Sequence, residues 1–172
     1  LEANTTASAN TALGYEAGNA LTTGAGNVAV GYEALKTEDG HGNNTAVGYR
    51  ALKDLNAGAT GNNSVLGYNA GANITTGIKN TLIGSLAGDA TTDADENVAV
   101  GYDALGTNTL GSHSVAIGPS ALRSQNYGSA TNSYNTAVGS FAGYAVTTGT
   151  NLTLIGGQAG DALTEGVNNV AV

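Results

Sequence analysis

A nine-residue phrase, Asn-Thr-Ala-Val-Gly-Tyr-x-Ala-Leu or a close variant, recurs along the chain and constrains the fold more than any other feature. Its glycine returns at intervals of 17 residues, apart from one interval of 19 and one of 21. A period of 17 residues is too short for helix-pair repeats, which need about 33 residues or more, or for propeller blades. It predicts an all-β fold, a parallel β-roll or β-solenoid of about nine coils. The glycines are Gly14, Gly31, Gly48, Gly67, Gly84, Gly101, Gly118, Gly139 and Gly156.

The residues before each of these glycines alternate as in a short strand. The residue immediately before the glycine is always Leu, Val or Ile, and the residue three places before the glycine is Thr, Ser or Val. These two columns lie on one face of a strand, whereas the Ala, Val or Leu between them points to the opposite face. Both faces are therefore expected to be buried, in strands of about four residues. Gly and Asn recur in every repeat and are poor helix formers, so we expect no helix longer than a turn or two.

Alanine occupies the third position after the glycine in all nine repeats. This predicts a second strand that approaches its neighbour too closely for a larger side chain. The glycine itself fits a tight turn that requires positive φ. The rest of each repeat is rich in Gly, Thr, Asn and Asp, which is typical of a return loop. Residues 10–172 form the predicted array, with its last repeat truncated, and residues 1–9 form a lead-in segment.

Composition excludes several classes of protein. The chain has no Cys, which excludes a disulfide scaffold and a thiolate metal site. A net charge of −8, with only five Lys and Arg, argues against nucleic acid and anionic lipid as partners. No apolar run approaches the roughly 18 residues that a membrane-spanning segment needs, so we expect no membrane insertion in this segment.

The apolar pattern also predicts self-association. Inward residues that are mostly Ala, Val and Thr bury little area, whereas ordering a coil costs roughly 1.5 kcal/mol for each residue. One face of the strand can fill the chain's own roll, and the other can pack on partner chains. We therefore expect a homo-oligomer, although these patterns leave the number of chains open.

Two stretches resemble known fibre proteins. The stretch SVAIG at residues 114–118, followed by Ser120 and Ala121, is similar to the head repeat of YadA-like trimeric autotransporter adhesins. The stretch NTAVGYRAL at residues 44–52 looks like the repeat arrays of phage-type tail fibre proteins. The resemblance covers residues 10–172. It implies a left-handed homotrimeric β-roll about the fibre axis, without a catalytic centre, located outside the cell on a bacterial surface or virion. The 17-residue period and a tyrosine column depart from the adhesin head.

Residues able to support catalysis or metal binding are scattered. His41 and His113 lie in different repeats, in or beside loops, and we assign them structural or solvated roles. Residues 93–97 begin like a calcium loop, but Val98 and Ala104 stand where that loop needs Gly and a bidentate Glu. A solvated acidic turn is expected there, with weak calcium binding as the alternative. We recognise neither a catalytic triad nor a phosphate-binding loop, and predict no enzyme, no cofactor and no catalytic or metal-binding residue.

Two polar columns have both a structural and a binding interpretation. Asn opens most repeats, and we expect a ladder of side-chain amides between coils, with glycan recognition by exposed amides as the alternative. Tyr follows the glycine in five repeats. A buried or inter-chain stack is expected there, with a sugar-binding stripe as the alternative. The tyrosines of this column are Tyr15, Tyr32, Tyr49, Tyr68 and Tyr102.

The leading functional hypothesis is a structural fibre segment that holds or forms a host- or receptor-binding surface. The alternatives are a spacer or filament subunit without a ligand of its own, and an ice-binding solenoid, which the interrupted threonine column disfavours. Inserted residues in a solenoid emerge as outer loops. The longer insertion, at residues 124–134, therefore supplies the candidate ligand contacts Tyr127, Asn132 and Tyr134, for a cell-surface glycan or a protein receptor.

Overall fold

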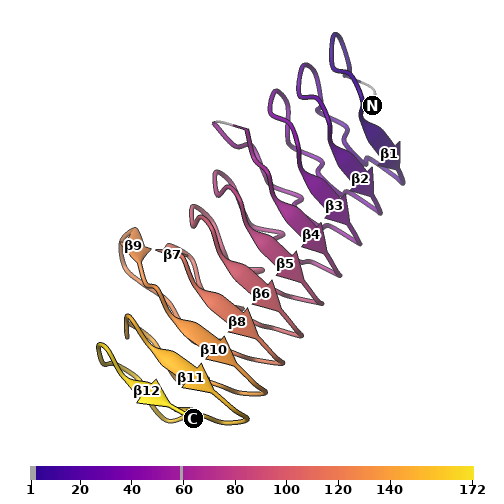
Figure 1. The fold of residues 1–172 in the computed structure, drawn as a ribbon. Coiled ribbons are helices and arrows are strands. Elements are labelled where there is room, and N and C mark those ends of the chain that lie inside the picture. Colours follow the sequence, from indigo (N-terminus) through magenta and orange to yellow (C-terminus); the bar gives the residue numbers. More distant parts are fainter. Residues whose placement is uncertain (1–2, 59) are drawn as a thin grey trace.

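The computed structural model describes residues 3–58 and 60–172, and these residues form strands, turns and loops without a helix. Ten strands make one sheet, in which each strand pairs in parallel with the strand of the next coil (Figure 1). The predicted all-β parallel solenoid with coils of about 17 residues is confirmed. Residues 1–2 of the predicted lead-in and Ala59 lie outside the described residues. The ten strands are β1 Thr11–Leu13, β2 Val28–Val30, β3 Thr45–Val47, β4 Ser64–Leu66, β5 Thr81–Ile83, β6 Val98–Val100, β8 Val115–Ile117, β10 Thr136–Val138, β11 Thr153–Ile155 and β12 Val170–Ala171.

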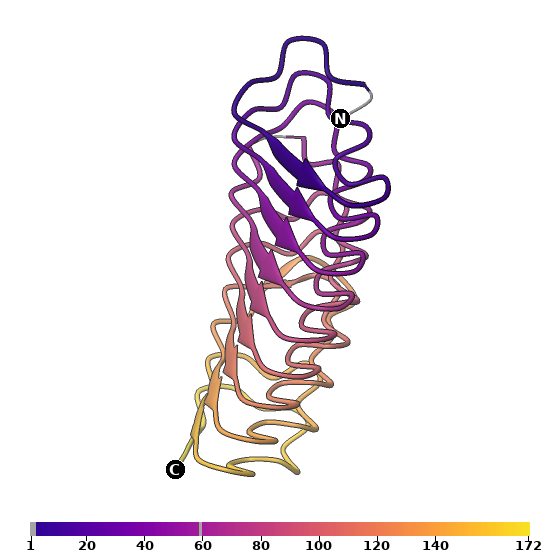
Figure 2. The ribbon, with the colours of Figure 1, turned by 90° about the vertical axis from the view of Figure 1, so that its right-hand side faces the viewer.

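The coils stack in register, and the two ends of the chain lie at opposite ends of the stack (Figure 2). Each column of the repeat pairs with itself, so that Ala29 of β2 is the partner of Ala12 on one side and Ala46 on the other. The longer repeats keep this register, since Val115 of β8 still pairs with Thr136 of β10 across the 21-residue repeat. The extra residues therefore leave the coil elsewhere. No helix among the described residues is long and apolar enough to cross a membrane.

The repeated glycine turns the chain at the end of each strand, as predicted. Gly48 has a φ of +138°, a conformation that side chains rarely adopt. A Cβ atom on Gly48 would also lie 2.2 Å from the backbone oxygen of Gly67 in the next coil. The glycine column is thus required twice, by the backbone conformation and by the close approach of neighbouring coils.

The alanine column does not lie on a second strand of the main sheet, and that prediction is wrong. Ala34, Ala51 and Ala104 are fully buried in the turn that follows each glycine. Neighbouring coils are joined there by single backbone hydrogen bonds, such as Leu35 N–H to Ala51 O at 3.0 Å. The alanines are small because this turn packs against the chain's own core. The alanine column is therefore not evidence for contacts with partner chains. Within the described ranges, the other β-pairings are the short parallel sheet of β7 Gly111–Ser112 and β9 Thr131–Asn132 and a single parallel bridge between Thr150 and Val167.

The core is larger than the repeat pattern suggests, because leucines that follow the alanine column point inward. These are Leu35, Leu52, Leu105 and Leu122, all buried and all with φ near 50°. Where glycine takes this position, neighbouring aliphatic side chains fill the same space. A Cβ atom on Gly71 would lie 2.9 Å from Leu82 Cδ1 and 3.0 Å from Ile74 Cδ1. One core thus runs through all the coils. It is filled at this position by the leucine itself in some coils, and by neighbouring aliphatic side chains where the position is glycine.

The two faces of the main sheet differ in burial. The middle residue of each strand from β2 to β11 in the main sheet, such as Ala46 or Leu82, points into the core and is buried. The residues on either side of it point outward and are half-buried or exposed. The expectation that both faces are buried is wrong for a single chain, since its own coil covers only one of them.

Candidate functional site

The outer face of the main sheet carries a row of aliphatic side chains, one from each coil. Leu66 is 49% exposed and Ile155 is 36% exposed, although both are large and apolar. The neighbouring outward column holds threonine in five of its first nine positions and Val or Ser in the others. We call this surface the outer strand face. Its aliphatic residues are Leu13, Val30, Val47, Leu66, Ile83, Val100, Ile117, Val138 and Ile155.

The longer insertion is only partly an external loop. Residues 128–130 are exposed, and a Cβ atom on Gly128 would meet no atom within 4 Å. The same holds for Gly58 in the 19-residue repeat. Strand β9 then returns the chain to the stack by pairing with β7. Gln125 and Ser133, by contrast, are fully buried.

Tyr127, one of the predicted ligand contacts, lies inside the coil. It is 6% exposed, and its hydroxyl donates a hydrogen bond to Gly149 O at 2.6 Å. The amide of Asn135 in turn donates to the Tyr127 hydroxyl at 3.1 Å. Burial raises the pKa of the Tyr127 phenol. Tyr127 is thus a structural residue in this chain, because its hydroxyl satisfies inward polar groups and does not reach the surface.

The other two predicted contacts, Asn132 and Tyr134, are exposed and lie together. Asn132 Nδ2 donates to the Tyr134 hydroxyl at 3.4 Å. The Tyr134 ring lies 5.1 Å from the ring of His113, centre to centre, at an angle of 47°. His113 Nε2 is 3.3 Å from Glu96 Oε2, and Glu96 Oε1 accepts a hydrogen bond from Lys79 at 2.8 Å. That bond from Lys79 lowers the pKa of Glu96.

His113 and Glu96 lie beside the insertion, although neither was expected there. A signal was present, since Lys79, Glu96, His113 and Tyr134 all lie five residues before a repeated glycine. All four have a left-handed backbone, with φ between 49° and 63°. Residues of one column stack on one another along a solenoid, so the column position places them side by side.

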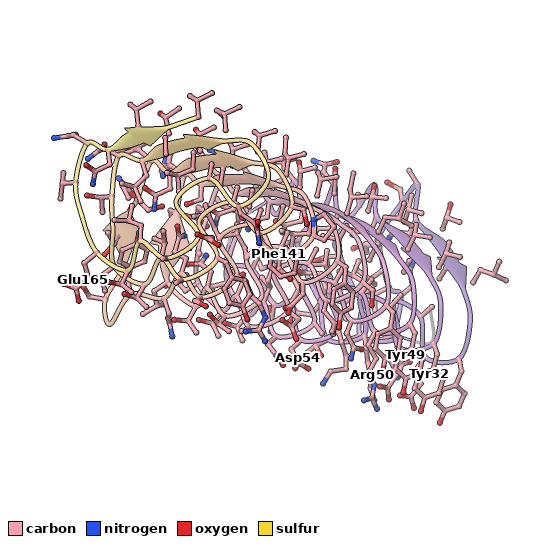
Figure 3. The ribbon with its side chains drawn as sticks, turned by 90° about the horizontal axis from the view of Figure 1, so that it is seen from below. Tyr32, Tyr49, Arg50, Asp54, Phe141 and Glu165 are labelled. Atoms are coloured by element: carbon pink, nitrogen blue, oxygen red, sulfur yellow. The ribbon has the colours of Figure 1, made fainter. Side chains whose placement is uncertain are left out.

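The tyrosine column forms an exposed stack along the chain, and the expectation of a buried stack is wrong for a single chain. Adjacent rings of Tyr15, Tyr32, Tyr49 and Tyr68 are 5.1–5.2 Å apart and within 14° of parallel. The guanidinium of Arg50 lies over the Tyr49 ring, 5.1 Å from its centre. Figure 3 shows Tyr32, Tyr49 and Arg50 together on the outside of the coils. Ser85 interrupts the column before Tyr102.

Ion pairs connect three successive coils beside this stack. Lys36 Nζ lies 2.6 Å from Glu16 Oε2 and 3.0 Å from Glu33 Oε1, while Arg50 Nε lies 2.8 Å from Glu33 Oε2. Hydrogen bonds that Lys36 and Arg50 donate lower the pKa of Glu33, and the bonds that Lys36 donates to Glu16 and Glu33 raise the pKa of Lys36. Such pairs near the surface each stabilise the fold only slightly.

The asparagine column is the predicted ladder, and it points inward. Asn44 N–H donates to Asn27 Oδ1 at 2.9 Å, and Asn80 Nδ2 donates to Ala94 O at 2.8 Å. The side chains of Asn27, Asn44, Asn63, Asn80, Asn97 and Asn135 are buried. These amides are therefore engaged between coils and are not available to an external glycan.

The histidine and acidic loops have internal partners. Glu38 is fully buried and accepts hydrogen bonds from the backbone N–H of His41 at 2.8 Å and of Ala57 at 3.3 Å. Glu38, Asp39 and His41 place their ligand atoms within 4.8 Å of one another, but Glu38 is already committed to these bonds. In the acidic turn, Asp95 Oδ1 accepts the N–H of Ile78 at 2.8 Å. Glu38 and Asp95 therefore have structural roles between coils.

Comparisons of the chain with protein-family models, with curated proteins and with solved structures gave no match. The fold alone defines the class, a β-solenoid repeat protein with one main strand in each coil.

Proposed function

We propose that the chain is a non-enzymatic structural segment of an extracellular fibre, of the kind found in bacterial surface adhesins and phage-type tail fibres. In this proposal three copies associate as a left-handed β-roll about a common axis, and the segment holds or forms a surface that binds a host receptor. The number of chains, the handedness and the location follow from the resemblance of residues 10–172 to the repeats of those proteins.

The observation that carries the proposal is the outer strand face. Monomeric soluble proteins rarely expose a continuous apolar patch of more than a few hundred Å². Here every coil adds an outward aliphatic side chain to one row, as Ile83 and Ile117 do. The nine aliphatic residues of this row lie on nine neighbouring strands at a spacing of about 4.8 Å, so the row extends over about 38 Å. Packing such faces around an axis would remove them from water, and the resulting contact would be continuous along the fibre.

The contacts between coils are suited to a stiff rod. Each coil is tied to the next by its strand, most coils also by the asparagine ladder, and the first four by the tyrosine stack. Because each coil touches its neighbours through equivalent residues, the array can carry load along its axis without a separate domain.

Sedimentation of the wild-type chain at micromolar concentration tests the proposal. We expect a trimer, which Ile155→Lys should weaken at least tenfold because it places a charge in the outer strand face. The matched control is Gln158→Lys, which adds the same charge to an exposed position three residues later, beyond the glycine turn. A wild-type chain that sediments as a folded monomer contradicts the proposal.

The two alternatives predict different behaviour. A spacer would form the same trimer but bind no receptor through this segment. An ice-binding solenoid would show thermal hysteresis, and it would require an outer strand face accessible to ice and not covered by partner chains. Threonine supports the ice-binding alternative only in part, because Val28, Ser64, Val98 and Val115 interrupt the outward threonine column.

A further inference from the structure

The corner of the coil beside the longer insertion gathers an aromatic ring, a carboxamide, an imidazole and a carboxylate on one exposed surface. We propose that Tyr134, Asn132, His113 and Glu96 form a binding site for neutral carbohydrate. This inference rests on the receptor-binding role proposed above and names the class of ligand.

The aromatic part of the site has a geometry that the tyrosine stack lacks. In the stack, rings such as Tyr32 and Tyr49 lie parallel and 5.1 Å apart, so they cover each other's faces. Tyr134 meets only the tilted ring of His113 among the described aromatic residues, and it is 53% exposed. A sugar presents C–H groups on one face of its ring and packs that face on an accessible aromatic ring. Tyr134 therefore offers a ring face on which a sugar can pack, whereas both faces of the inner stacked tyrosines, Tyr32 and Tyr49, are covered.

The polar groups around Tyr134 complement hydroxyl groups. The carboxamide of Asn132 has both a donor and an acceptor, and its Nδ2 already points toward the Tyr134 hydroxyl. The two Glu96 oxygens are oriented by Lys79 and His113. His113 Nδ1 is buried and has no hydrogen-bond partner in the described part of the chain, so Glu96 is the polar group that orients this imidazole. Vicinal hydroxyls of a saccharide can donate to carboxylate or amide oxygen and accept from amide nitrogen.

The backbone holds this arrangement without help from a ligand. Strand β9 pairs Asn132 with Ser112 of β7, and Ser133 N–H donates to Ser112 O at 2.9 Å. His113 N–H donates to Asp95 O at 3.1 Å. Asn132 and His113 thus lie next to residues of a fixed parallel pair, and less side-chain ordering is required when a ligand binds.

Charge and surface character favour a neutral sugar over an anionic sugar or a protein. The Glu96 carboxylate and the net charge of −8 disfavour an anionic ligand, and Lys79 is paired with Glu96. A protein interface needs an apolar anchor within a patch of several hundred Å². Ser129 and Ala130, which precede Asn132 in the insertion, are exposed and small, and the exposed Asn151, whose backbone N–H donates to Ser133 O, is polar.

The test applies the full 172-residue chain to an array of neutral oligosaccharides ending in galactose, glucose, mannose or fucose, with sialylated versions of the same glycans. The best neutral ligand is then titrated against variants. We expect Tyr134→Ser and Asn132→Ala each to weaken binding at least tenfold, and Tyr134→Phe, which keeps the ring, to weaken it by less. The backbone tolerates serine in this conformation, since Ser120 has a φ of 56°. The matched control is Tyr102→Ser, which removes another tyrosine that is about half exposed.

Circular dichroism and sedimentation of each variant separate loss of binding from loss of fold. The inference is overturned if the wild-type chain binds no neutral glycan, if it prefers the sialylated glycans, if its receptor proves to be a protein without glycan, or if Tyr134→Ser binds like wild type. A trimer that binds no glycan overturns only this inference and leaves the structural role standing. A monomer that binds neutral glycan through Tyr134 overturns the proposed fibre assembly and leaves the site.

Discussion

The side-chain oxygen Oδ1 of Asn80 accepts a hydrogen bond from the backbone N–H of Asn97, 17 residues further along the chain, at 3.0 Å. The same amide donates from Nδ2 to Ala94 O at 2.8 Å. One buried side chain therefore satisfies a donor and an acceptor of the following coil. This relationship is repeated along most of the stack and makes the asparagine column a structural requirement.

Replacing Asn80 with leucine should therefore destabilise the chain. The variant leaves the Asn97 N–H and the Ala94 carbonyl without these partners in the interior, at about 1–3 kcal/mol for each group, or about 2–6 kcal/mol together. The measurement is the midpoint of urea unfolding followed by circular dichroism. Asn10→Leu is the matched control, because Asn10 is only partly buried at the start of the stack and water can replace its bonds. Equal midpoints for Asn80→Leu and wild type would contradict the ladder.

The glycine column should tolerate alanine unequally. A Cβ atom at position 101 would lie 2.6 Å from the backbone of Gly118, whereas at Gly156 its nearest contact is Ala159 Cβ at 3.9 Å. Both glycines have φ between +125° and +139°, so both variants carry backbone strain. We expect Gly101→Ala to be less stable than Gly156→Ala by about 1–3 kcal/mol, the cost of overpacking, as measured by thermal unfolding. If Gly101→Ala and Gly156→Ala were equally stable, the positive φ angle alone, and not the contact with the next coil, would explain the glycine column.

The tyrosine stack should stabilise the first four repeats. Tyr32→Ala removes stacking with both Tyr15 and Tyr49, at about 0.5–1.5 kcal/mol for each pair, or about 1–3 kcal/mol in total. Tyr102→Ala serves as the control, since Ser85 separates Tyr102 from the stack. The tyrosine signal in near-ultraviolet circular dichroism should fall more in Tyr32→Ala than in Tyr102→Ala. The idea fails if the two variants lose equal signal and equal stability.

Removing the buried hydroxyl of Tyr127 should lower the free energy of unfolding by less than replacing Asn80 does. Tyr127→Phe removes the bond to Gly149 O, but Asn135 Nδ2 still donates to that oxygen at 2.7 Å. We therefore expect a loss of about 1–2 kcal/mol in urea unfolding, against a change within about 0.5 kcal/mol for the exposed control Tyr102→Phe. A loss as large as that of Asn80→Leu would show that Asn135 cannot compensate.

Tyr127 also gives the wild-type chain a pH dependence that Tyr127→Phe should lack. Burial raises the pKa of its phenol above the ordinary value of 10.0. Between that value and the folded-state pKa, the folded chain holds the proton and the unfolded chain releases it. Stability must therefore fall as the pH rises above 10. Unfolding midpoints measured from pH 8 to 11 should converge for the two proteins, and a constant difference would rule out this linkage.

Much of the fold could be predicted from the repeat. The interval between successive glycines predicted the coil, and the apolar residue before each glycine predicted the strand, because a solenoid places equivalent residues of every coil in one column. The asparagine ladder followed from the same argument. The alanine column was misassigned to a second strand, because a small buried residue is required equally in a strand and in a tight turn. The inward leucines were missed because left-handed backbone at Leu35 or Leu52 is not evident from residue type.

The candidate site could be predicted only in part. The break in the period identified the insertion, and Asn132 and Tyr134 are indeed exposed there. Tyr127 belongs to the same insertion and has the same residue type as Tyr134, yet it is buried. His113 and Glu96 come from earlier repeats, and their residue types alone do not link them to the insertion.

The sequence by itself determined the period, the position of the strands and the need for glycine and asparagine at fixed places, because these depend on local backbone conformation and on the equivalence of neighbouring coils. Only the tertiary structure decided which side chains of the 21-residue repeat point inward. The surplus chain could leave the coil at any point of the turn, and it leaves at Gly128, where nothing opposes it. That exit point places Tyr127 in the core and Tyr134 beside His113, since the residues on either side must rejoin the register of the stack.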